Sequence, residues 1–154
     1  MAGSRFLPQV IVEPALATKP LPEQIRWICA HRRGPLASDT MTPTQLMQAI
    51  DIQLAHVWMV RAFLKHSEEA AEDDELADVH RELYDFMLAL GGSLKDGYAD
   101  EYLRLAGKKF GKLKRATETF ARIQPEVSQH TNFAMAAASL TAAVAEIGRL
   151  LGQP

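Results

Sequence analysis

The stretch that decides the fold runs from residue 41 to residue 66 and reads MTPTQLMQAIDIQLAHVWMVRAFLKH. Thr42, Pro43 and Gln45 have the pattern of a helix N-terminus, with an N-cap threonine, a proline in the first turn and the glutamine of a capping box. The second half of the helix is apolar on almost every side; its polar interruptions are His56, Arg61, Lys65 and His66. A helix that is apolar all round must be covered all round, by helices of its own chain or by another subunit. We therefore expect this helix to be the centre of the fold.

Two amphipathic helices are expected to follow it. Asp73 or Asp74 can cap a helix that reaches a stop at Gly91-Gly92, because the apolar residues between them recur every three or four positions. After a turn at Asp96-Gly97, the same spacing returns from residue 103 to residue 124. Each of these helices thus has one apolar face to bury.

Pro125 is expected to interrupt that helix, and a last, alanine-rich helix begins between Pro125 and Thr131. Four long helices with short joints predict an all-α fold, an antiparallel four-helix up-and-down bundle. Residues 1–20 mix prolines with apolar side chains, which predicts an extended N-terminal arm, and residues 21–33 predict a short extra helix. The expected organisation is the arm over 1–20 followed by one helical bundle domain over 21–154.

Composition narrows the classes of function expected of this chain. The chain has 154 residues and a formal net charge of -2, which argues against binding to nucleic acid, since that usually needs a basic excess. Cys29 is the only cysteine, so no intramolecular disulfide can form, and a reducing, cytoplasmic setting is expected. No run of eighteen apolar residues occurs, so we expect no membrane span.

These features favour a protein interaction or assembly module that forms a homo-oligomer, acts without a cofactor and is not an enzyme. Three neighbours seldom cover every side of a helix, so the expected interface includes Trp58, Met59 and Phe63 of the central helix. A basic run offers a second contact, through Lys108, Lys109 and Lys112, to an anion or a nucleic acid, or to an acidic patch of a partner. The acidic segment over 68–75 of a second subunit is the nearest candidate for that patch.

One enzymatic alternative rests on a short resemblance. Arg61 is followed five positions later by His66, a spacing that resembles the motif of HEPN-type ribonucleases, although Ala62 stands where that family usually has a polar residue. The resemblance implies a metal-independent ribonuclease in which the arginine binds an RNA phosphate and the histidine transfers a proton. The structural alternative pairs Arg61 with a carboxylate and leaves His66 at the helix C-terminus, where the helix dipole favours a cation.

A metal site is the third alternative. Histidines recur in different expected helices, in a layout that resembles the DinB-like metal-binding bundles. Glu126 and His130 are four residues apart, so on a continuous helix they would share one face. The candidate ligands are His56, His80, Glu126 and His130.

Overall fold

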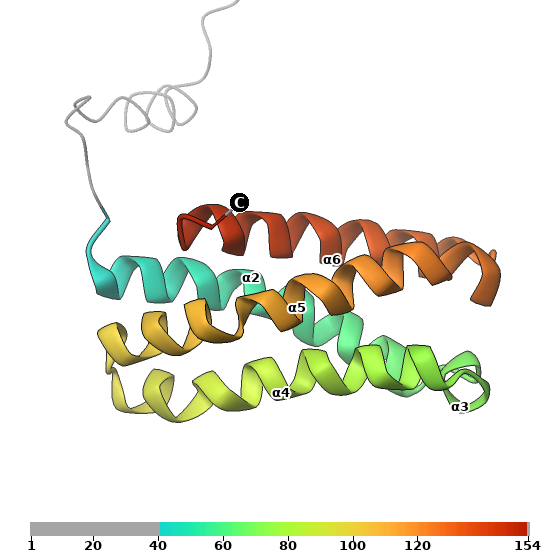
Figure 1. Cartoon of the computed structure of the whole chain (residues 1–154), viewed down its shortest axis with the longest axis horizontal. Coiled ribbons are helices and arrows are strands. Elements are labelled where there is room, and N and C mark those ends of the chain that lie inside the picture. The colour runs from blue at the N-terminus through green and yellow to red at the C-terminus, as the bar shows by residue number, and fades with distance from the viewer. Residues whose placement is uncertain (1–40, 154) are drawn as a thin grey trace, which may run out of the picture. The chain divides into compact units, whose positions relative to one another are not determined.

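The structure is a computed structural model that describes residues 41–153, so the expected N-terminal arm and the expected helix over 21–33 lie outside the described residues. Within that range the chain forms helices and no strand, which confirms the all-α prediction. The helices are α2 (Pro43–Lys65), α3 (Glu69–Glu72), α4 (Asp74–Asp96), α5 (Ala99–Val127) and α6 (Thr131–Leu150) (Figure 1).

The start of α2 has the predicted capping box. The Gln45 backbone N–H donates to Thr42 Oγ1 at 3.2 Å, and the Thr42 N–H donates to Gln45 Oε1 at 2.8 Å. Both groups would otherwise lack a partner at the first turn, so the reciprocal pair determines where the helix begins.

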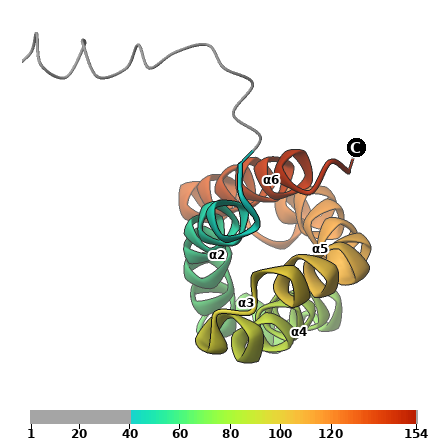
Figure 2. The same cartoon turned by 90° about the vertical axis from the view of Figure 1, so that its left-hand side faces the viewer.

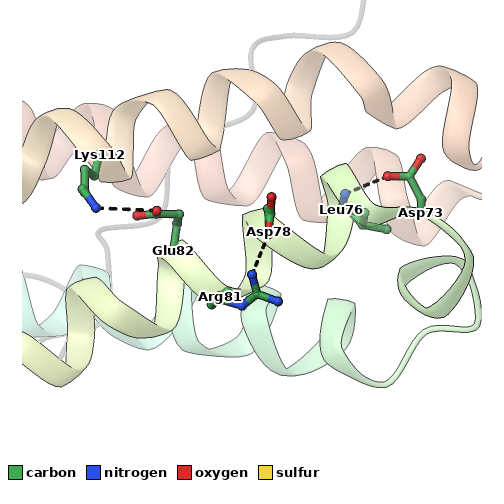
Figure 3. Close-up of polar contacts among 6 residues, drawn as sticks. All are labelled: Asp73, Leu76, Asp78, Arg81, Glu82 and Lys112. Carbon is green, nitrogen blue, oxygen red and sulfur yellow. Dashed lines mark hydrogen bonds and ion pairs between the residues drawn. The ribbon is translucent and has the colours of Figure 1, made fainter.

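The start of α4 was also predicted, but its end was not. The Asp73 carboxylate accepts the Leu76 N–H at 2.7 Å, as Figure 3 shows. The expected stop at Gly91-Gly92 is wrong, because α4 continues to Asp96 and ends at Gly97, whose φ is +73°. Each glycine costs a helix about 1 kcal/mol, but the buried Ser93 and the residues around it hold the last turns against the core.

Pro125 does not end the preceding helix either. It lies inside α5, which runs to Val127, so the expected interruption falls a few residues too early. The proline removes only one backbone donor near the helix end, and Ile123 just before it is buried. His130 then caps α6, with its Nδ1 accepting the Asn132 N–H at 3.2 Å.

The core is built on contacts between the long helices, most extensively between α4 and α5 and between α2 and α6. The ring of four long helices is visible when the molecule is viewed end-on, as in Figure 2. Each long helix contributes a stripe of buried apolar side chains spaced by three and four residues. The largest fully buried members are Tyr102, Phe120, Ile50, Leu64, Leu76, Leu83, Leu90, Leu113, Leu140 and Ile147.

Helix α6 packs closely against α5. A Cβ built on Gly148 would lie 2.8 Å from Phe110 Cζ, so the glycine lets the aromatic ring approach the α6 backbone. By length and composition alone, α6 is apolar enough to cross a membrane, with a mean hydropathy of 1.3 over its best window. A core helix meets the same criterion, and Leu140 and Ile147 of α6 are fully buried in the core.

This close contact predicts opposite effects for two glycines. Gly148→Ala should lower the free energy of unfolding by about 1–3 kcal/mol, because the new methyl overpacks against Phe110. The matched control is Gly92→Ala, also inside a helix but with no heavy atom within 4 Å of the new Cβ. It should raise the free energy of unfolding by about 0.5–1 kcal/mol. Urea titrations followed by circular dichroism measure both, and a loss of similar size in both variants would contradict the prediction.

Candidate interaction surface on α2

One side of α2 is buried and the opposite side is apolar but uncovered by the described residues. Val57 and Leu64 are fully buried against the other helices. In contrast, Ile52, Trp58 and Met59 are 65%, 48% and 69% exposed. Isolated exposed apolar residues are ordinary, but several large ones on one helix indicate a contact surface. Trp58 and Met59, which we assigned to an interface, are therefore accessible, although no partner is present to test that role.

Phe63 is placed differently from the other two. Its ring packs edge-on against Phe133 of α6, with 4.9 Å between the ring centroids, and the side chain is partly buried. It thus contributes to the contact between α2 and α6 within one chain. The sequence pattern did not distinguish this position from Trp58 and Met59 because all three lie in the same apolar run.

Arg61 has a different partner from the one expected. Among residues 41–153 it forms no ion pair, so no carboxylate of the described chain fills the expected role, and the pairing stays a prediction. Its guanidinium carbon instead lies 5.5 Å from the ring centroid of Trp58 and 4.7 Å from that of Tyr84 on α4. Cation–π attraction to two rings holds the planar group between α2 and α4, and its Nε is buried without a hydrogen-bond partner.

The histidine near this arginine is His80 of α4. Burial lowers the pKa of His80, and the positive charges of Arg61, Arg81 and Lys65 lower it further. Its Nδ1 is buried without a partner in the described part of the chain. Two unpartnered buried nitrogens thus lie in a region of α2 and α4 that is rich in positive charge.

The ribonuclease alternative involves a different histidine. His66 is the C-cap of α2, where its backbone N–H donates to carbonyls of the last turn, and its side chain is exposed. Its position at the helix C-terminus agrees with the structural alternative. Arg61 is directed toward the aromatic rings of the α2–α4 groove. The ribonuclease alternative requires Arg61 and His66 of two copies to come together at one RNA phosphate. It stays a prediction.

The four candidate metal ligands are spread over the molecule. His56 on α2 lies 3.5 Å from the Ser139 hydroxyl of α6, whereas His80 belongs to the α2–α4 groove. Glu126 lies in the last turn of α5, which ends at Val127, and His130 caps α6, so they do not lie on one continuous helix. In residues 41–153 no three His, Cys, Asp or Glu side chains are arranged to hold a metal ion.

The basic run on α5 is partly used within the chain. Lys112 lies 3.7 Å from the Glu82 carboxylate of α4 (Figure 3), and Arg122 pairs with Glu75 in the same way. Lys112 is therefore less available for a partner than we expected, while Lys108 is exposed and Lys109 is partly buried. Of the acidic segment over 68–75, Glu75 pairs within the chain with Arg122, which lies beyond the basic run, and the partner of Lys112 is Glu82, outside that segment.

Sequence reasoning missed three residues around Trp58 and Arg61, namely Asp51, Tyr84 and Tyr102. Asp51, Trp58 and Tyr102 line an open hollow of about 290 Å³ between α2, α4 and α5. The Tyr102 hydroxyl is buried with no hydrogen-bond partner among residues 41–153, and burial, together with the charge of Asp51, raises its pKa. Tyr84 and Asp51 had no local signal, because their importance comes from neighbours on other helices.

Comparisons with known proteins assign this chain to no family. No protein-family model, curated protein or solved structure matches the chain. Any functional conclusion therefore rests on the geometry of α2 and its neighbours.

The environment of His80 predicts a pH dependence of stability. Its folded-state pKa is below the ordinary 6.5, so the unfolded chain binds the proton more readily. Stability should therefore fall as the pH drops below about 6.5, until the lowered folded-state pKa is passed. His80→Gln should lose less stability than the wild type between pH 7.5 and 5.5 in urea titrations. Arg61→Gln removes one of the positive charges that lower the pKa of His80, so it should reduce the loss of stability in part. Parallel pH profiles of stability for the wild type and both variants would contradict the assignment of this pH dependence to His80.

Proposed function

We propose that this protein is a non-enzymatic helical-bundle module that self-associates and serves in protein interaction or assembly. The uncovered apolar side of α2 is the observation that carries the proposal. Exposing Ile52, Trp58 and Met59 to water is unfavourable by about 25 cal/mol per Å² of apolar surface. A contact that covers them in a second copy recovers that free energy.

We further propose that the long helices form an antiparallel four-helix up-and-down bundle. Contacts of α2 with α4 and α6, and of α5 with the same two helices, support this arrangement. Phe63 contacts Phe133, and His56, earlier on α2, contacts Ser139, later on α6. Residue numbers thus rise along one helix as they fall along its neighbour, which is the pattern of an antiparallel pair.

The proposed setting is the cytoplasm, with protein partners and with neither nucleic acid nor a membrane span. The single Cys29 suits a reducing compartment, and the net charge of -2 does not favour a polyanion. The ion pairs between α4 and α5 also use part of the local basic charge. For α6 we favour the role of a core helix, since its apolar stripe is buried against α2 and α5.

Self-association is tested with the full chain in solution. Sedimentation velocity at micromolar concentration should show a dimer or a larger species. Ile52→Glu should shift the protein toward the monomer, because a carboxylate would have to be buried in the interface. Met135→Glu is the matched control, since Met135 on α6 is 64% exposed, close to the 65% of Ile52, and lies on another helix. A wild-type protein that stays monomeric at all concentrations would refute the proposed function.

A further inference from the structure

The hollow beside Trp58 lies where small residues interrupt the facing stripes of α2 and α4. Asp51, Ala55 and Trp58 are spaced by three or four residues, so they share one side of α2. Gly91 lies on α4 between two larger apolar residues that also line the hollow. A Cβ built on Gly91 would have no heavy atom within 4 Å. The methyl group of Ala55 and the missing side chain of Gly91 therefore leave open a space of about 290 Å³.

A polar side chain from α5 is buried at the floor of this hollow. Tyr102 is 0% exposed, and its hydroxyl has no hydrogen-bond partner among residues 41–153. Native structures satisfy nearly all buried polar groups, so an unpartnered hydroxyl beside an open space indicates that a bound molecule supplies the partner. Burial, and then the charge of Asp51, raise the pKa of this hydroxyl, which stays neutral and can both donate and accept a hydrogen bond.

The charge of the hollow is negative and the rest of its wall is largely apolar. Of the described residues that line it, only Asp51 carries a charge at neutral pH. Asp51 forms no ion pair with any residue of the described range. The ring of Trp58, which also contacts Arg61, gives the hollow an aromatic wall, and Leu54 and Leu90 are apolar. The hollow is therefore complementary to a cation that has an apolar body.

We propose that this hollow binds a small organic ammonium ion, with the charged nitrogen between the Asp51 carboxylate and the Tyr102 hydroxyl and the apolar body against Trp58. The ammonium donates to both oxygens, and the ligand's ring packs against the indole. The volume is near the lower limit of small-molecule sites, roughly 300–1,000 Å³, so the ligand is a simple amine with about one ring. An anion would be repelled by Asp51. This site goes beyond the proposed self-association and does not depend on it.

Calorimetric titration of the full chain with phenethylammonium chloride tests the charge requirement. Binding should be saturable, with a Kd in the millimolar range or tighter, and phenethyl alcohol, which lacks the charge, should bind at least about tenfold more weakly. Asp51→Asn should weaken phenethylammonium binding by at least about tenfold. The matched control is Asp85→Asn, the same charge change at an exposed residue of α4 outside this hollow, and it should leave the Kd unchanged. Equal Kd values for the two variants, or no binding of the amine, would overturn the proposal.

Two further variants locate the ligand within the hollow. Gly91→Leu fills the space and should abolish amine binding, whereas Gly92→Leu, the next residue of the same helix but outside the hollow, should retain it. A Cβ at either glycine meets no heavy atom within 4 Å, so both variants should keep the helix content of the wild type by circular dichroism. Retained binding in Gly91→Leu would refute the assigned position.

Tyr102→Phe tests the buried hydroxyl separately from the charge. It should weaken amine binding several-fold, because the ammonium loses one acceptor. The melting temperature of the free protein should be unchanged or higher, since the hydroxyl removed has no partner among residues 41–153. A lower melting temperature together with unchanged amine binding would show that the hydroxyl is already bonded in the free protein, and would overturn its role in this site.

Discussion

Mutual packing of the apolar stripes of the four long helices is the constraint on which the rest of the structure depends. Helix α2 contributes a buried stripe that includes Val57 and Leu64 and contacts α4, α5 and α6, while α4 and α5 make the most extensive contact with each other. Three neighbouring helices seldom cover the whole circumference of a helix. A helix that is apolar nearly all round therefore keeps some apolar side chains exposed. The same residues that organise the core therefore leave Ile52, Trp58 and Met59 in water. The apolar residues around α2 thus account both for its burial in the core and for its proposed association.

The electrostatic character of the α2–α4 groove follows from Arg61, which has no ion pair with any residue of the described range 41–153. Aromatic rings can hold a guanidinium in position, but they do not neutralise its charge. The remaining positive charge lowers the pKa of His80, whose ring is also desolvated. On the other side of α4, Glu75 and Glu82 pair with cations of α5. Helix α4 thus has one face whose carboxylates pair with cations of α5. Its other face lies beside Arg61, which has no ionic partner among residues 41–153.

Predictions from local chemistry were accurate, and predictions that ignored packing were not. The capping residues Thr42 and Asp73 act on backbone groups three residues away, so their pattern is visible in the sequence. Gly91 and Pro125 disfavour helix locally, yet α4 and α5 pass through them. Burial of neighbouring side chains outweighs a local cost of about 1 kcal/mol for each helical glycine. The contacts of Phe63 and Arg61 could not be predicted for the same reason, because their partners Phe133 and Tyr84 are distant in the sequence.

The sequence alone determined that the described chain is all-helical, where α2 and α4 begin and which stripes are apolar, since helix caps and the 3.6-residue repeat depend on residues within one or two turns. Only the tertiary structure decided which apolar residues are covered and which charges are paired. Those outcomes depend on how the helices pair in space, and the same apolar run contains the buried Val57 and the exposed Met59. The contrast between these two residues, one in the core and one on the proposed interface, arises because the helix turns by about 200° over two positions.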